Sequence, residues 1–114
     1  MTGSRKTDGA HALATMHCKP NAPRLPDAEL RAHLAGLAGW KHVSDRIEKT
    51  FRFANYVRTM AFVNAVASIA QREDHHPDLG VHYDNCVVAW STHDAGGVTL
   101  NDLICAARTD AIAA

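Results

Sequence analysis

The sequence has little that would direct it to a nucleic acid or a membrane. Its 114 residues include 12 Lys and Arg and 12 Asp and Glu, so no net charge favours nucleic acid or anionic lipid. No apolar run approaches the roughly twenty residues of a membrane span, and the N-terminus lacks the apolar core of a secretory signal. We therefore expect a cytoplasmic protein that binds neither nucleic acid nor membrane.

Cysteine is also scarce, with Cys18, Cys86 and Cys105 as the only three. An odd number of cysteines without a CxxC spacing argues against a disulfide framework and against a Cys-based zinc site. Cys86 and Cys105 lie in apolar segments and are interpreted as small core residues, the usual position of a free buried cysteine.

The length allows one domain, small enough for its stability to depend on oligomerisation. Residues 1–26 contain three of the four prolines and show little periodicity, so we expect a flexible N-terminal extension without a core of its own. The folded domain would then comprise residues 27–114.

Apolar periodicity predicts the elements of this domain. A spacing of three and four after Asp27 indicates a short amphipathic helix, and a period of two indicates strands over residues 40–43 and 46–53. A further strand over residues 86–91 is largely apolar on both faces, so we expect both faces to be covered. The strands over residues 46–53 and 86–91 are the two that the pattern alone establishes.

A long helix over about residues 56–72 follows Asn55, a favourable N-cap residue. Its apolar residues form two adjoining rows, a stripe wide enough to suggest a second burial partner such as another subunit. A helix buried only in its own core is the alternative, and the pattern leaves both open. A last helix over about residues 100–111 follows Thr99, which forms a capping-box pattern with Asp102.

Three histidines in a short span suggest a proton-transfer site. His75 and His76 precede Pro77, which stops the helix and displays the pair on a rigid corner, and His93 follows the strand over residues 86–91. Neutral imidazole has a pKa near 6.5, so it can give and take protons at cytoplasmic pH without a metal. The pattern favours an enzyme.

With these motifs the chain resembles the pterin-4a-carbinolamine dehydratase family. Members carry His-His-Pro, a Tyr shortly after it, Thr-His before a Gly-rich turn, and an Asp on the following helix. The matching residues here are His75, His76, Pro77, Tyr83, Thr92, His93, Gly97 and Asp102. The resemblance extends upstream to Gly39, Trp40 and the aromatic residues that follow, so it covers about three-quarters of the chain.

The resemblance implies an α+β fold in the order α-β-β-α-β-β-α, with a four-stranded antiparallel sheet and three helices packed on one face. The resemblance also implies a strand near residues 80–83, where the alternation of apolar and polar residues is too short to predict a strand by itself. Family members assemble as homodimers or homotetramers, so the same is expected here.

The implied activity is dehydration of 4a-hydroxytetrahydrobiopterin, or a related 4a-hydroxytetrahydropterin, to quinonoid dihydropterin. This reaction recycles the pterin cofactor of aromatic amino acid hydroxylases, and the enzyme needs no cofactor or metal. Carried over from the family, His75 and His93 form the acid–base pair and His76 holds the pterin and stabilises charge. Pro77, Thr92 and Asp102 would contribute to substrate binding, although the capping box accounts for Asp102 equally well.

One position departs from the family pattern: many members have Glu four residues before the first His of the pair, and this chain has Gln71. A carboxylate that could orient an imidazole is therefore missing there, and Glu73 or Asp74 is the possible substitute. Because the three histidines are present, the departure affects the expected geometry and not the expected reaction.

Two other functions compete with catalysis. Relatives also serve as dimerisation or assembly partners, of a homeodomain transcription factor and, in some bacteria, of RuBisCO, so a non-catalytic protein-binding module is the alternative. A metal site is the other, formed from His75, His76, Asp78, His82 and His93. Adjacent histidines in an extended chain point in opposite directions and rarely bind one ion, so we expect no metal.

Overall fold

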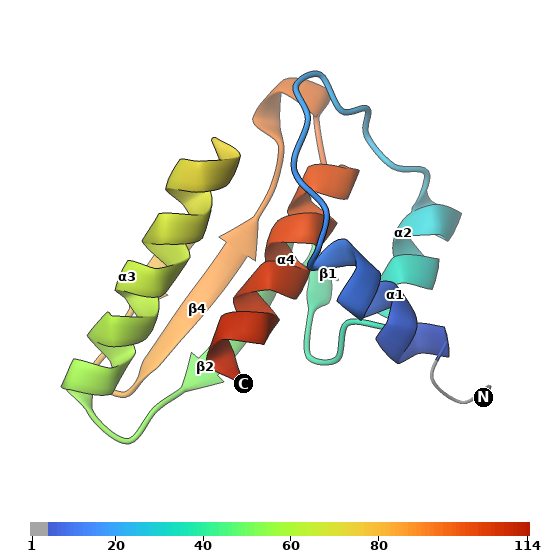
Figure 1. The fold of residues 1–114 in the computed structure, drawn as a ribbon. Helices are drawn as coiled ribbons and strands as arrows, with labels where there is room; N and C mark the ends of the chain where they lie inside the picture. Colours follow the sequence, from blue (N-terminus) through green and yellow to red (C-terminus); the bar gives the residue numbers. More distant parts are fainter. Residues whose placement is uncertain (1–4) are drawn as a thin grey trace.

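The structure is a computed structural model that describes residues 5–114 (Figure 1). The helices are α1 (Arg5–Leu13), α2 (Asp27–Leu34), α3 (Tyr56–Glu73) and α4 (Leu100–Ala113), and the strands are β1 (Lys41–Val43), β2 (Arg46–Arg52), β3 (Asp78–Val81) and β4 (Asn85–Trp90). A short 3₁₀ helix, His93–Ala95, lies between β4 and α4. Within residues 5–114, no helix is both long and apolar enough to cross a membrane.

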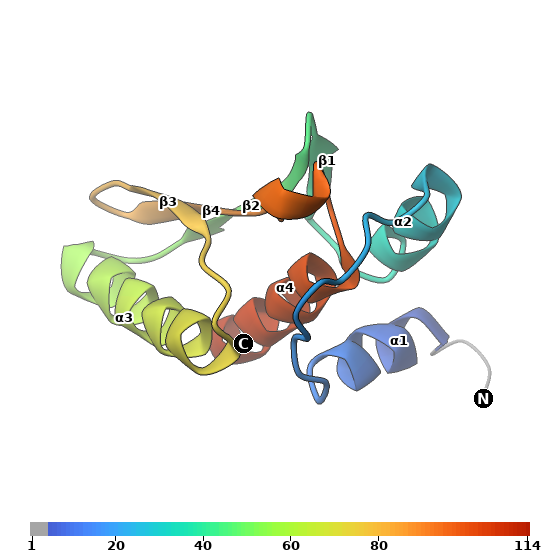
Figure 2. The ribbon, with the colours of Figure 1, turned by 90° about the horizontal axis from the view of Figure 1, so that it is seen from above.

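The strands form one four-stranded sheet in the order β1-β2-β4-β3, and all neighbouring strands are antiparallel. α3 and α4 lie on the same face of this sheet (Figure 2). The predicted α+β class is confirmed, including both short strands. Ser44 and Asp45 form the turn between β1 and β2, with Ser44 in the left-handed region at φ 56°.

The core lies between the sheet and its two long helices. Side chains of a strand alternate between its faces, so Ile47 and Trp90 pair across β2 and β4 on the face that α3 and α4 cover. Both residues are fully buried, as are Val66 on α3 and Leu103 on α4. Burial of this apolar area, at about 25 cal/mol per Å², is the main stabilising contribution that fixes β4 and α4 relative to each other.

The prediction that both faces of β4 are covered is wrong for part of the strand. Val87, whose side chain alternates with the buried Cys86 and Val88, is only half-buried. Its partners on the neighbouring strands are Thr50 and Gly80, which offer little apolar surface to cover it. The helices that cover β4 lie on the other face (Figure 2).

α3 begins as predicted, because the Asn55 side chain accepts a hydrogen bond from the backbone N–H of Arg58 at 2.9 Å. Only one of its two apolar rows is buried throughout, and this row includes Phe62, Val66 and Ile69. The second row is more exposed, with Tyr56 at 49%. The second burial partner inferred from the wide apolar stripe is thus not supplied within residues 5–114, and an oligomer stays a prediction.

The segment before residue 27 contains a helix that the sequence pattern did not predict. α1 packs beside α4, and its Leu13 is 5% exposed and belongs to the core (Figure 1). The chain after α1 is hydrogen-bonded to α3 through Cys18 and to α4 through Lys19, and the flexibility of the extension stays a prediction. Residues 1–4 of that extension lie outside the described residues, and the domain boundary at residue 26 stays a prediction.

Candidate active site

His75 is positioned by the end of α3. Asp74 adopts a left-handed conformation at φ 51°, and the backbone N–H of His75 still donates to the carbonyl of Ala70 at 3.2 Å. This turn points the imidazole back over the core, where its ring stacks on the indole of Trp90. The His75 side chain is 13% exposed, so this residue is largely buried and is not a solvated loop histidine.

The carboxylate of Asp102 holds His75 from the side of α4. Nε2 of His75 lies 2.5 Å from Oδ1 of Asp102, whose side chain has no exposed surface. The other oxygen, Oδ2, accepts hydrogen bonds at 2.9 Å from the hydroxyl of Thr92 and from the backbone N–H of Thr99. The bond from Thr99 is part of the predicted capping box, so one carboxylate both caps α4 and orients the imidazole.

A cavity of about 720 Å³ opens beside this cluster. Its lining includes His75, Thr92, Asp94 and Asn101, together with residues 18–24 of the segment that precedes α2. The volume lies within the range of small-molecule sites, about 300–1,000 Å³. Because Nε2 of His75 is occupied by Asp102, Nδ1 is the ring nitrogen left for a group in the cavity.

The structure brings together three of the predicted site residues: His75, Thr92 and Asp102. His76 and His93 are exposed, and neither belongs to the cavity lining. Their predicted roles stay predictions. The same holds for Asp102 as a substrate contact, because in the structure its carboxylate is fully buried behind His75.

Pro77 is half-buried and follows the exposed His76 at the corner between α3 and β3. It prevents α3 from continuing and so contributes to the position of the His pair. A direct contact of Pro77 with a substrate stays a prediction.

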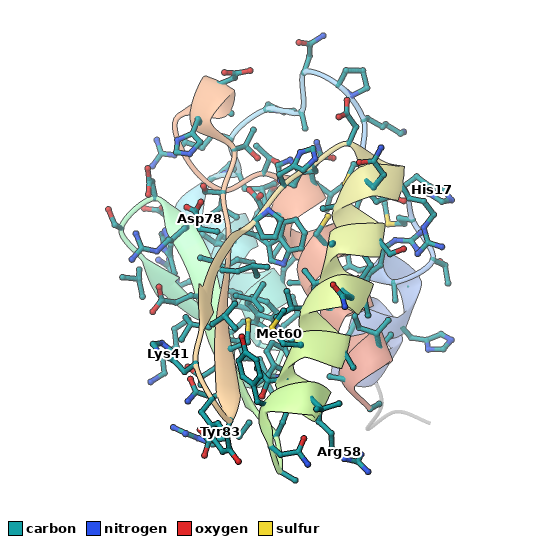
Figure 3. The ribbon with its side chains drawn as sticks, turned by 90° about the vertical axis from the view of Figure 1, so that its left-hand side faces the viewer. His17, Lys41, Arg58, Met60, Asp78 and Tyr83 are labelled. Carbon is teal, nitrogen blue, oxygen red and sulfur yellow. The ribbon has the colours of Figure 1, made fainter. Side chains whose placement is uncertain are left out.

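The carboxylate that orients an imidazole in this structure is that of Asp102. Gln71, at the position where many family members have Glu, is exposed. The suggested substitute Glu73 has another contact: its side chain, 3% exposed, accepts from the backbone N–H of Cys18 at 2.7 Å and meets Nδ1 of His17 at 2.9 Å. Burial alone would raise the pKa of Glu73, but the Cys18 N–H, His17 and the nearby Arg108 together hold it below its ordinary value. Figure 3 shows His17 beside the C-terminal end of α3.

The candidate metal ligands do not assemble. Within residues 5–114, no three His, Cys, Asp or Glu side chains lie close enough together to hold an ion. Figure 3 shows Asp78 on the side of the sheet away from α3, so it does not face the surface on which α3 packs.

The chain is thus a small α+β protein in which a carboxylate-held imidazole borders a ligand-sized cavity. Comparison with known proteins identifies the family. A model described as "Pterin 4 alpha carbinolamine dehydratase" matches residues 23–112. The chain belongs to this family.

Similar proteins agree with this assignment. A protein of Chromobacterium violaceum, named "Putative pterin-4-alpha-carbinolamine dehydratase", is 53% identical over 102 residues, covering 88% of this chain and 94% of its own. A protein of Xanthomonas campestris with the same name is 54% identical over 101 residues, covering 84% of this chain and 86% of its own.

Solved structures show the same fold. A crystal structure titled "transcriptional coactivator/pterin dehydratase" from Brucella melitensis has a TM-score of 0.77 and 32% identity, covering 80% of this chain and 99% of that one. A pterin dehydratase-like protein described as a RuBisCO assembly factor has a TM-score of 0.54 and 24% identity, covering 65% of this chain and 86% of that one, and shows the fold alone.

Proposed function

We propose that this protein is a cytoplasmic lyase that dehydrates 4a-hydroxytetrahydrobiopterin, or a related 4a-hydroxytetrahydropterin, to the quinonoid dihydropterin. The observation that carries the proposal is the largely buried His75, held at Nε2 by Asp102 and bordering the cavity. Membership of the dehydratase family supports it. The reaction would recycle the pterin used by aromatic amino acid hydroxylases.

The elimination needs two proton transfers at one flat ring. One proton is delivered to the 4a-hydroxyl, which leaves as water, and the N5–H proton is removed so that its electron pair forms the C4a–N5 double bond. His75 and His93 divide these transfers, one as acid and one as base. The buried carboxylate of Asp102 fixes the ring orientation of His75 and stabilises the imidazolium that forms when Nδ1 takes up a proton.

The remaining residues hold the substrate. His76, which is exposed and follows His75 in the chain, binds the pterin and stabilises developing charge. Thr92 borders the cavity while its hydroxyl donates to Asp102 at 2.9 Å, so it links the substrate surface to the buried carboxylate. Pro77 keeps the His pair at the corner, and Asp102 acts as a positioning residue.

The test is the rate of 4a-carbinolamine dehydration, followed by ultraviolet absorbance in a coupled hydroxylase assay. The informative variants are His75→Gln and His93→Ala, because Gln fills much of the space that the largely buried imidazole occupies. Each should lose about 10²- to 10⁴-fold in kcat, the usual contribution of a general acid or base. The exposed His42, which does not line the cavity, provides the control His42→Ala with unchanged kcat. A wild-type protein that does not exceed the uncatalysed rate would refute the proposal.

A second candidate function is protein binding, favoured by apolar side chains that remain exposed. Val57 is 77% exposed, Tyr83 is 68% exposed, and Tyr83 stacks on Tyr56 at the start of α3. Exposed apolar groups of this kind are typical of interaction surfaces. We propose that a second copy of the chain binds this exposed apolar surface, so that the protein forms a homodimer or homotetramer. Sedimentation of the wild type and of Val57→Lys tests this, because a monomeric wild type would refute it.

A further inference from the structure

Residues 18–24, called the strap below, connect the segment after α1 to the start of α2 and border the cavity that contains His75. Figures 1 and 2 show the chain between α1 and α2 passing beside the N-terminal end of α4. The family model begins at residue 23, so family membership gives most of the strap no role. The contacts of the strap explain why it lies beside His75.

The strap is anchored at its first end to both α3 and α4. The side chain of Asn101 on α4 makes two hydrogen bonds to the backbone of Lys19: Oδ1 accepts from its N–H at 3.0 Å, and Nδ2 donates to its carbonyl at 2.8 Å. The backbone N–H of Cys18 donates to Glu73 at the end of α3. Asn101 and Glu73 are both buried, so these hydrogen bonds are shielded from water.

The other end of the strap is anchored to the chain that leads into α4. The backbone N–H of Leu25 donates to the carbonyl of Val98 at 2.9 Å, and Arg24 forms an isolated β-bridge with Thr99. Thr99 is the residue whose N–H binds Asp102, the partner of His75. The second anchor therefore includes a residue that also holds the carboxylate beside His75.

Between its anchors, the strap lines the cavity, and several of its residues have restricted backbone conformations. Pro20 and Pro23 fix their own φ angles, and Asn21 has φ 60°, a left-handed conformation that is uncommon for a residue other than glycine. Such a conformation persists only where surrounding contacts impose it, and it often occurs at ligand sites. The backbone N–H groups of Asn21 and Ala22 lie near the middle of the strap. Within residues 5–114 they donate no hydrogen bond to a backbone carbonyl.

We infer that the strap is the second wall of the substrate site and that Asn101 is the positioning residue that holds it there. The inference rests on the proposed function. The ligand is a flat bicyclic pterin lying between His75 and the strap, and the amide and carbonyl groups near Asn21 match the donors and acceptors on the edge of its pyrimidine ring. The strap binds the ring and takes no part in proton transfer.

The test separates binding from chemistry. The dissociation constant of 7,8-dihydrobiopterin, a pterin that cannot undergo the dehydration, is measured by calorimetry, and kcat and KM come from the dehydration assay. Asn101→Ala removes both hydrogen bonds to Lys19 and should weaken pterin binding and raise KM by about tenfold. Its kcat and the pH profile of kcat should match the wild type, because His75 and Asp102 are untouched.

Two further variants complete the experiment. Asn21→Gly keeps the left-handed conformation accessible but loosens the strap, and it touches no core residue, so it should raise KM in the same direction even where Asn101→Ala folds poorly. Asn64→Ala, the same change as Asn101→Ala at an exposed position of α3, is the control and should leave both constants unchanged.

The outcomes distinguish the two proposals. An active wild type with weaker pterin binding and unchanged kcat in the strap variants supports the inference. An active wild type whose pterin affinity is the same in Asn101→Ala and Asn21→Gly overturns the strap's role and leaves the dehydratase proposal intact. A wild type that neither binds 7,8-dihydrobiopterin nor dehydrates the carbinolamine overturns both.

Discussion

The imidazole of His75 lies almost parallel to the indole of Trp90, with 5.7 Å between ring centroids and 12° between ring planes. Trp90 comes from β4 and is fully buried, and its Nε1 has no hydrogen-bond partner within residues 5–114. The indole therefore supports His75 by packing, while Asp102 supports it by a hydrogen bond from α4. A ring held on one face and at one edge has a defined orientation before any substrate binds.

Asp102→Asn tests the hydrogen bond while keeping the shape of the side chain. The amide can still accept from the N–H of Thr99, so α4 should keep its cap, but the negative charge next to His75 is lost. We expect kcat to fall by about 10²-fold, near the lower limit of a general acid–base contribution, and KM to change little. Steady-state kinetics of dehydration, with a pH profile of kcat, measures both.

The matched control is Asp110→Asn on the same helix. Asp110 also binds a cation and a ring N–H, from Lys49 and Trp40, but it does not line the cavity. It should lower the free energy of unfolding and leave kcat unchanged. Equal losses of kcat in the two variants would mean that a negative charge anywhere on α4 supports catalysis. Asp102 would then have no specific role in positioning His75.

The two histidines proposed as acid and base should differ sharply in their effect on stability. His75→Ala leaves Oδ1 of the buried Asp102 carboxylate without its partner while the two bonds to Oδ2 remain, and an unsatisfied buried acceptor typically costs about 1–3 kcal/mol. His93 is exposed in the 3₁₀ helix, so His93→Ala should change the free energy of unfolding by no more than about 0.5 kcal/mol. Urea denaturation of both variants checks this, and equal stabilities would contradict the arrangement around His75.

The elements of the domain were largely predictable from the sequence because their signals are local. Asn55 before an apolar periodic run gave the start of α3, and Thr99 with Asp102 gave the cap of α4. The same local signals placed His75 and His76 on a corner after the helix and gave no sign that His75 would be largely buried. The contacts of His75 with Trp90 and Asp102, which lie 15 and 27 residues further along the chain, show that it packs against the core.

The strap could not be predicted because its contacts join positions far apart in the sequence. Cys18 meets Glu73, and Lys19 meets Asn101, 82 residues later, through backbone groups that every residue type carries. A segment rich in proline without apolar periodicity is typical of a flexible tail. It is ordered here because buried side chains on two helices provide hydrogen bonds for its backbone.

In the reduced protein, the three cysteine thiols should differ in how readily they react with a thiol reagent. The thiol contact with Cys18, at 3.6 Å between sulfur atoms, and burial raise the pKa of Cys105, and burial raises that of Cys86. Because the thiolate is the reactive form, both should react with Ellman's reagent only on unfolding. The half-buried Cys18 should be the one thiol that reacts in the native state at pH 8. A native Cys18→Ser variant that still shows a fast-reacting thiol would contradict this assignment.

Glu73 should make stability depend on pH in the acid range. Burial opposes its ionisation, but the Cys18 N–H, His17 and Arg108 hold its pKa in the folded state below the ordinary value, so its contribution is full at neutral pH and is lost as pH falls through the folded pKa. Glu73→Gln should therefore lower the free energy of unfolding by about 1–3 kcal/mol at pH 7, the range for a hydrogen-bonded buried charge. Below about pH 4.5 the difference from wild type should shrink, because the unfolded carboxyl takes up a proton at a higher pH than the folded one.

Urea titrations between pH 7 and pH 3 measure this difference, and the exposed Glu29 supplies the control Glu29→Gln, with an effect within about 0.5 kcal/mol at every pH. A difference between Glu73→Gln and wild type that stays constant down to pH 3 would show that the strap gains nothing from the charge of Glu73. The hydrogen bond from the N–H of Cys18 would then contribute without help from a negative charge, beside the hydrogen bonds that Asn101 makes to Lys19.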